Sequence, residues 1–221
     1  MKVGVIAVQG AVTEHIDTLR KAMKELKIDG CAVAVRTAKD LDDVSGLVIP
    51  GGESTTISRL ILDAGMQQKI IELVQKGSPI LGTCAGAILL AKEGDEQVKQ
   101  TKTNLLGIME MQVNRNAYGR QVDSFEADLQ IDEIGKKPFK GIFIRAPTIE
   151  KVWRPTRVWA KHKDAIIGAQ KGNVIAITFH PELGDDLRIH EYFLKMILNQ
   201  KLPMQIIDDP DNAQKVIKLK S

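Results

Sequence analysis

A cysteine stands between small residues in the segment Gly82–Gly86 (GTCAG), with a short apolar run on either side. The run before it predicts a strand and the run after it predicts a helix, so Cys84 falls on the turn between them. Small flanking residues permit a tight turn that lifts a nucleophile above the edge of a sheet. A helix N-terminus also favours a thiolate, and the N–H of Ala85 could stabilise an oxyanion. The pattern therefore predicts that Cys84 is a nucleophile.

A nucleophilic cysteine needs a base, and His180 is the best-placed histidine for that role. It follows the apolar run 174–179, which predicts a buried strand, so it lies at the edge where open α/β sheets place their sites. The Glu182 carboxylate could orient the imidazole as the third member of a triad. The remaining histidines are expected to be surface or packing residues: His15, His162 and His190.

A third predicted strand end carries the segment Pro50–Thr56 (PGGESTT). Its glycines allow the backbone to approach a ligand, and Ser54 or Thr55 could cap the helix that follows. The Gly-Lys-Ser/Thr ending of a phosphate-binding loop is absent. We interpret this loop as a second set of backbone N–H groups that face Cys84.

Alternating strands and helices must bring these strand ends together. Strands are predicted at 3–8, 31–35, 46–49 and 79–82, and helices at 12–26, 55–63, 66–76 and from 87. This alternation, with short glycine-rich turns, is typical of a parallel sheet covered on both faces.

The pattern changes after about residue 104. Strands without helices between them are predicted at 105–113, 121–131, 139–145, 157–161, 165–170 and 173–179, and a last helix at 186–200. A mixed or antiparallel extension on one side of the sheet is expected. We predict one domain over residues 1–200, followed by a C-terminal tail over 201–221 of unknown role.

The composition excludes several classes of protein. The chain has 221 residues, 43% of them apolar, and a formal charge of only +3 with both signs interspersed, which does not favour a nucleic-acid partner. Two cysteines cannot form a disulfide framework, and Cys31 is expected to be a buried thiol in its strand. No zinc-site spacing, signal segment or membrane span is evident, so we expect a cytoplasmic protein with no membrane partner.

Three motifs end the three strands in the order that is typical of class I (triad-type) glutamine amidotransferases: Pro50–Gly52, Gly82–Gly86 and Phe179–Glu182. Further segments resemble the glutaminase subunits of pyridoxal 5′-phosphate synthase: Val8–Gly10, Gly52–Thr56, Arg115–Phe125 and Ile144–Pro147. The resemblance covers roughly residues 2–200. It implies an α/β, three-layer, flavodoxin-like fold with a mostly parallel central sheet and an antiparallel extension.

The resemblance also implies roles for individual residues. Cys84 would attack the side-chain amide of L-glutamine and form a γ-glutamyl thioester with release of ammonia, while His180 shuttles protons and Glu182 orients it. The family's glutamine-binding positions correspond to Gly52, Glu53, Ser54, Arg115, Ile144 and Arg145. Backbone groups of Gly51, Gly52 and Ala85 would form the oxyanion hole. No metal or cofactor is implied, because pyridoxal phosphate would be the product of the complex.

The partner implied by the resemblance is a separate (β/α)8 synthase subunit in a large hetero-oligomer, which receives the ammonia through the protein interior. Members of the family turn over poorly until that partner docks. Such gating would follow if the Gly51–Gly52 peptide completes the oxyanion hole only on docking. We expect the docking surface around Gln9 and Gly10, the Gly51–Ser54 loop and the first helix, because ammonia must leave near the thiol.

Three alternatives remain at this point. A glutaminase of another synthase, such as imidazole glycerol phosphate synthase, would share the triad but not the Glu53–Thr56 and Arg115–Phe125 segments. A peptidase or stress protein of the related intracellular-peptidase fold would lack the late His-Pro-Glu motif with Glu182. A non-catalytic scaffold subunit would not need three triad residue types in this order.

Overall fold

The computed structural model describes residues 1–115 and 124–201. The first half alternates strands and helices: β1 (Lys2–Ile6), α1 (Val12–Glu25), β2 (Cys31–Val35), the 3-10 turn η1 (Ala38–Leu41), β3 (Gly46–Ile49), α2 (Ser54–Asp63), α3 (Gln67–Gln75), β4 (Ile80–Thr83) and α4 (Ala85–Leu90). Each of these elements except η1 was predicted from the sequence, to within a few residues at its ends.

The second half consists mainly of strands. Its elements are β5 (Ala91–Gly94), α5 (Glu96–Gln100), β6 (Met109–Asn114), β7 (Ser124–Leu129), η2 (Asp132–Ile134), β8 (Phe139–Ile144), β9 (Thr148–Val152), β10 (Arg157–His162), β11 (Ala165–Lys171), β12 (Val174–Ile177), η3 (Pro181–Leu183) and α6 (Arg188–Lys201). Five were not predicted: β5, α5, η2, β9 and η3. The predicted C-terminal tail lies outside the described residues, apart from its first position.

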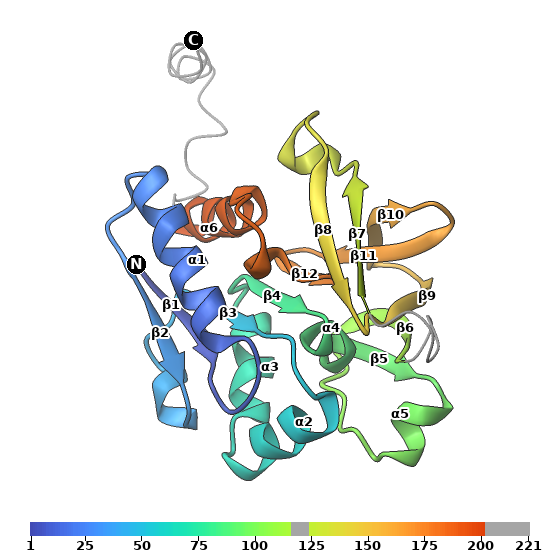
Figure 1. Ribbon diagram of the computed structural model, residues 1–221. Helices are drawn as coiled ribbons and strands as arrows, with labels where there is room; N and C mark the ends of the chain where they lie inside the picture. Colours follow the sequence, from blue (N-terminus) through green and yellow to red (C-terminus); the bar gives the residue numbers. More distant parts are fainter. Residues whose placement is uncertain (116–123, 202–221) are drawn as a thin grey trace, which may run out of the picture.

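The described strands form a ten-stranded sheet in the order β2-β1-β3-β4-β12-β11-β9-β6-β5, with β10 paired to β11, and β7 and β8 form a separate pair (Figure 1). Neighbours from β2 to β12 are parallel, whereas β11 is antiparallel to β12, β9 and β10. The predicted fold class, a mostly parallel central sheet with an antiparallel extension, is confirmed.

Two apolar cores lie on opposite faces of this sheet. One contains residues of α1, α6 and the β7–β8 pair, and the other contains residues of α2, α3 and α4 (Figure 1). The strand β1 contributes to both, because Val3 and Val5 join the first core and Ile6 joins the second. A strand covered on both faces has no polar side, which is why the central strands read as unbroken apolar runs.

The parallel strands bring their carboxyl ends to one edge of the sheet. The loop after β3, the turn after β4 and the turn after β12 meet there, because β4 lies between β3 and β12 in the sheet. This is the edge at which open α/β folds bind ligands.

Candidate active site

The turn between β4 and α4 holds Cys84 in a strained backbone conformation. Its φ is 47° and its ψ is −104°, a region that residues other than glycine rarely adopt. The Cys84 N–H donates to the carbonyl of Ile177 on β12 at 2.8 Å, which ties the turn to the neighbouring strand. The structure thus places the thiol on the sharp strand-to-helix turn that the sequence predicts.

The small residues around Cys84 have a steric cause. A Cβ at Gly86 would lie 2.0 Å from the carbonyl oxygen of Ile49, and a Cβ at Gly82 would lie 2.8 Å from the backbone of Gly86. Neither position can carry a larger residue without moving β3 or α4. The Gly-x-Cys-x-Gly spacing is therefore what the close packing of this turn requires.

His180 and Glu182 reach the same edge from the turn that follows β12. The N–H of His180 donates to the Ile142 carbonyl at 2.8 Å, and the imidazole Nδ1 lies 2.7 Å from Glu182 Oε1. Both side chains are buried. The structure brings Cys84, His180 and Glu182 together, because the imidazole hydrogen-bonds to both the carboxylate and the thiol.

The environment favours a proton on this imidazole. Burial alone would lower the pKa of His180, but hydrogen bonds to Cys84 and Glu182 and their charges raise it to about 10. Burial would raise the pKa of Glu182, yet the neighbouring histidines lower it. A charged imidazolium beside Cys84 can stabilise negative charge on the sulfur.

The loop after β3 closes over the Cys84–His180 pair. A Cβ at Gly51 would lie 2.5 Å from His180 Cε1 and 3.2 Å from Cys84 Cβ, so only glycine fits there. The Gly51 N–H donates to Thr83 Oγ1 at 3.0 Å, and its carbonyl accepts from the Ala11 N–H at 3.0 Å. The Gly51 N–H is therefore not available to an oxyanion in this conformation, and its expected part in an oxyanion hole completed on docking stays a prediction.

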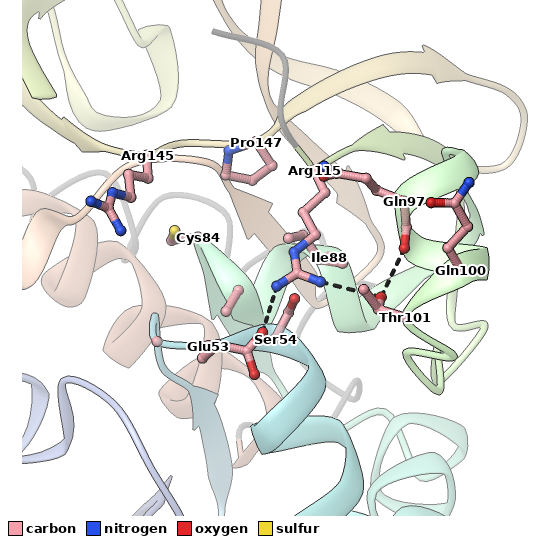
Figure 2. Close-up of a pocket in the computed structure, with 12 residues that line it drawn as sticks. Glu53, Ser54, Cys84, Ile88, Gln97, Gln100, Thr101, Arg115, Arg145 and Pro147 are labelled. Carbon is pink, nitrogen blue, oxygen red and sulfur yellow. Dashed lines mark hydrogen bonds and ion pairs between the residues drawn. The ribbon is translucent and has the colours of Figure 1, made fainter. Parts of the chain in front are cut away.

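A pocket of about 650 Å³ opens beside the thiol (Figure 2). Seven of the predicted site residues line it: Gly52, Glu53, Ser54, Cys84, Ala85, Arg115 and Arg145. The hydroxyl of Ser54 is buried and has no hydrogen-bond partner among the described residues. Native proteins rarely leave such a group unpaired, so this hydroxyl is free to contact a ligand.

Glu53 and Arg115 form an ion pair on the wall of this pocket. Arg115 Nη2 lies 2.5 Å from Glu53 Oε1 (Figure 2). Its Nη1 donates to Thr55 Oγ1 at 3.0 Å. Burial would raise the pKa of Glu53, but hydrogen bonds from Thr55 and Thr56, with the charge of Arg115, lower it to about 2. One cation and one anion thus stand side by side in the pocket.

The carboxylate of Glu53 also caps helix α2. It accepts the N–H groups of Thr55 and Thr56 at 3.0 and 2.7 Å. The sequence favoured Ser54 or Thr55 as the cap, and that prediction is wrong. Helix capping fixes Glu53 in place before any ligand arrives.

Ile144 and Arg145 enter from the end of β8. The carbonyl of Ile144 lies 4.0 Å from Cys84 Sγ, whereas its side chain is exposed, so it meets the site through its backbone. Arg145 has a φ of 43° and lines the pocket, with its guanidinium on the opposite side of Cys84 from Arg115 in Figure 2. Most of the predicted segment Arg115–Phe125 lies outside the described residues.

Two histidines lie behind the triad. The sequence predicts surface or packing positions for His15 and His190, and the structure places both in the interior, where their rings hydrogen-bond to each other at 3.0 Å. His15 also lies 3.4 Å from Glu182. His15 lies three residues after Val12 and four residues before Leu19, on the apolar stripe of α1. This spacing indicates a buried position and could have identified His15 from the sequence.

The other cysteine is exposed. Cys31 begins β2, a strand at the edge of the sheet, so the prediction that its thiol is buried is wrong. Residues 31–35 are apolar throughout, so their pattern does not reveal which end of the strand reaches solvent.

Within residues 1–115 and 124–201, no three His, Cys, Asp or Glu side chains are grouped so that they could hold a metal ion. None of the helices in these ranges is both long and apolar enough to cross a membrane.

Comparison with known proteins agrees with this geometry. The profile of the SNO glutamine amidotransferase family matches residues 5–199. The chain is 55% identical over 197 residues to the pyridoxal 5′-phosphate synthase subunit PdxT of Methanosarcina barkeri, covering 89% of this chain and 98% of the relative. It is 48% identical over 196 residues to the same subunit of Archaeoglobus fulgidus, covering 89% and 98%.

Solved structures give the same result. A crystal structure of a glutamine amidotransferase superposes with a TM-score of 0.78 at 42% identity, covering 88% of this chain and 98% of the other. The PurLQS structure from Thermotoga maritima, at 16% identity and a TM-score of 0.59 over 90% and 97% of the two chains, shares the fold. The chain belongs to the SNO glutamine amidotransferase family.

Proposed function

We propose that this protein is the glutaminase subunit of a pyridoxal 5′-phosphate synthase, which hydrolyses L-glutamine and delivers the ammonia to a synthase subunit. The observation that carries the proposal is the Cys84–His180–Glu182 arrangement, whose cysteine lines a pocket that also holds the Glu53–Arg115 ion pair. The names of the curated relatives support the choice of synthase.

Cys84 is the nucleophile in this mechanism. Its sulfur attacks the side-chain amide carbon of glutamine, and the carbonyl electrons move to oxygen to give a tetrahedral oxyanion. His180 donates a proton to the amide nitrogen as the C–N bond breaks, so that ammonia leaves and a γ-glutamyl thioester remains. His180 then takes a proton from water, which attacks the thioester and releases glutamate and the thiol.

Glu182 is the positioning member of the triad. Its Oε1 accepts from His180 Nδ1 at 2.7 Å, which directs Nε2 to the thiol and stabilises the imidazolium. The low pKa of Glu182 keeps it ionised for this purpose.

The backbone N–H groups of Gly52 and Ala85 are the proposed oxyanion donors. Ala85 follows the nucleophile at the start of α4, and both residues line the pocket with Cys84. Gly51 is excluded in the observed conformation because its N–H is already donated to Thr83.

The free amino acid end of glutamine fits the Glu53–Arg115 pair. A guanidinium suits the α-carboxylate and a carboxylate suits the α-ammonium group. The buried Ser54 hydroxyl supplies an unused polar atom on the same wall. We propose that Arg145 and the Ile144 backbone bind the substrate from the opposite wall.

The proposed partner is a (β/α)8 synthase subunit in a large hetero-oligomer that docks near the β1–α1 loop. That loop holds the Gly51–Gly52 region directly, because the Ala11 N–H donates to the Gly51 carbonyl and Gln9 Oε1 accepts the Glu53 N–H at 2.9 Å. A partner that moves this loop would reorient the Gly51–Gly52 peptide, which is how docking could switch the oxyanion hole on.

Residues 1–200 are proposed to act as one amidotransferase domain in the cytoplasm, where glutamine and the synthase subunit would both be present. The elements from β1 to α6 support this proposal, since they pack on one continuous sheet.

The test is glutamate release from glutamine by the purified protein, with and without the synthase subunit of the same organism. We expect strong stimulation by that subunit. Full activity without stimulation would argue for a different synthase, and the absence of activity in both conditions, with Cys84 reduced, would contradict the proposed function.

A further inference from the structure

A second polar cluster lies behind the triad, closed off from solvent. It consists of His15 on α1, Thr83 on β4 and His190 on α6, all with no exposed surface, and it adjoins Glu182. These residues come from three elements that are far apart in the sequence. Buried polar groups destabilise the folded state unless they are hydrogen-bonded, so the contacts within this cluster determine what it contributes to the protein.

His15 is the centre of this cluster. Its Nδ1 lies 3.0 Å from His190 Nε2, and its Nε2 lies 3.0 Å from Thr83 Oγ1. The same Nε2 is 3.4 Å from Glu182 Oε2, the oxygen that faces away from His180. Within the described residues that oxygen makes no hydrogen bond of normal geometry, so its contact with His15 is mainly electrostatic.

The position of the protons follows from the partners. His190 Nδ1 is buried and has no hydrogen-bond partner in the described part of the chain. An orphaned buried N–H is rarer than an under-satisfied acceptor, so the proton of His190 belongs on Nε2, from which it is donated to His15 Nδ1. His15 must then carry its own proton on Nε2, directed at Thr83 Oγ1 and Glu182.

Burial keeps both imidazoles neutral. It lowers the pKa of His15 and lowers that of His190 to about 3. The ionisable groups around His15 are Glu182 and His180 from the turn after β12, His190 from α6, and Glu14 from α1 itself. A neutral ring with its N–H toward a buried carboxylate can orient that carboxylate without adding a charge.

We propose that His15 is a positioning residue for the triad, which holds the outer oxygen of Glu182 and, through the Thr83 hydroxyl, the N–H of Gly51. Thr83 Oγ1 accepts the Gly51 N–H at 3.0 Å and, with the proton of His15 on Nε2, also the His15 N–H at 3.0 Å. One imidazole thus connects the carboxylate that orients His180 with the glycine that packs against His180. This inference rests on the proposed function of Cys84, His180 and Glu182.

The test compares His15→Leu, His15→Gln and Met23→Ala. Leucine removes the ring contacts, whereas the glutamine amide nitrogen can reach the place of Nε2 and donate to Thr83 and Glu182. Met23 is buried on the same face of α1, two turns further on, and serves as the matched control for lost packing. Thermal unfolding establishes that each variant is folded.

Two readouts separate positioning from packing. The first is kcat and KM for glutamate release with the synthase subunit present. The second is the pH dependence of Cys84 alkylation by iodoacetamide without the partner, read on the Cys84 peptide so that the exposed Cys31 does not contribute. The second readout reports on the thiol and His180 even if the chosen synthase is the wrong partner.

We expect His15→Leu to lower kcat about tenfold with little change in KM, and to shift the pH profile of alkylation. His15→Gln should recover most of kcat, and Met23→Ala should lower the melting temperature while kcat and the pH profile stay as in the unmodified protein. An unchanged kcat and profile in His15→Leu would overturn the proposal. Equal losses in all three variants would also overturn it, because they would show a packing effect.

The wild-type protein offers an independent check that needs no folded variant. Nitrogen-15 NMR of the histidine rings should show His15 protonated at Nε2 and not at Nδ1. A proton on Nδ1 would overturn the proposal, because His15 could not then donate toward Glu182.

Discussion

The parallel half of the sheet and its antiparallel extension contribute different parts of the site. The segments that follow strands β3, β4 and β12 carry Gly51, Cys84 and His180, all of which are buried. The extension contributes Arg115 after β6, and the separate β7–β8 pair contributes Arg145 after β8. Both arginines line the pocket. The Arg115 side chain is 24% exposed, and that of its partner Glu53 is 45% exposed.

This difference separates chemistry from recognition. Neighbouring parallel strands hold the reacting groups at one edge with a completely buried core on both faces, which limits how far they can move. The groups proposed to bind the amino acid end are longer, charged and partly solvated. Substitutions at the ends of the parallel strands should therefore reduce kcat, whereas those in the extension should raise KM.

Cys84→Ala should have the largest effect. Without the sulfur no thioester can form, so glutamate release should fall at least about 10⁴-fold. The side chain is small and buried, so folding and partner binding should persist on a sizing column. Loss of complex formation by this variant would contradict the separation of the reacting groups from the docking surface.

His180→Ala should follow, and it should be more damaging than Glu182→Gln. The orienting carboxylate is the more dispensable member of a triad, so Glu182→Gln should retain roughly 10- to 100-fold more activity than His180→Ala. The two variants are compared by kcat at saturating glutamine. Equal losses would count against the assignment of Glu182 as a positioning group.

Gly51→Ala should lower kcat about 100- to 1,000-fold, because the new Cβ would collide with His180 and displace the loop beside the oxyanion site. Gly184→Ala is the matched control, since the nearest atom to a Cβ there is 3.9 Å away. If Gly51→Ala is as active as Gly184→Ala, the loop can accommodate a Cβ at this position, which would contradict the expected collision with His180.

Arg115→Ala tests the extension. Loss of a charged hydrogen bond to the substrate carboxylate should raise KM roughly 10- to 100-fold with kcat changed only a few-fold. Arg157→Ala on β10 removes another ion-paired arginine of the extension, one that does not line the pocket, and should leave both constants unchanged. A loss confined to kcat in Arg115→Ala would contradict the assignment of substrate binding to the extension and of the reacting groups to the parallel half.

The smallest expected effect is on stability. The pKa of His180 is raised to about 10, so the folded protein holds this proton more tightly than the unfolded chain, whose value is near 6.5. The resulting stability is fully present below pH 6.5 and is lost as the pH rises toward 10. Urea unfolding should show a steeper decline over this range in the wild type than in His180→Gln, whereas His162→Gln should follow the wild type.

Much of this arrangement could be predicted from local sequence. The Gly82–Gly86 turn and the buried strands beside it are determined by residues that are close in the chain, so their pattern is visible without the fold. The strand β5 was missed because its sequence, Ala-Lys-Glu-Gly, has no apolar run, and it lies at an edge where one neighbour is enough. The strand β9 was missed because its sequence, Thr-Ile-Glu-Lys-Val, is short and its two apolar residues lie three positions apart, so it lacks the alternation of a strand.

Contacts between distant elements could not be predicted in this way. The pairing of His15 with His190 joins residues 175 positions apart, and that of Arg115 with Glu53 joins residues 62 positions apart. Each depends on how α1 packs on α6 or how β6 returns to the edge of the sheet. The donation of the Gly51 N–H to Thr83 likewise depends on the pairing of β3 with β4.

The central claim is that Cys84 is the nucleophile of a glutamine site, and the most direct test is labelling by the electrophilic glutamine analogue 6-diazo-5-oxo-L-norleucine in the presence of the synthase subunit. Mass spectrometry of the peptides should find the adduct on Cys84, with saturable kinetics and protection by glutamine, and no adduct on Cys31 despite its exposure. Equal labelling of Cys31, or labelling of Cys84 that glutamine does not slow, would contradict the account.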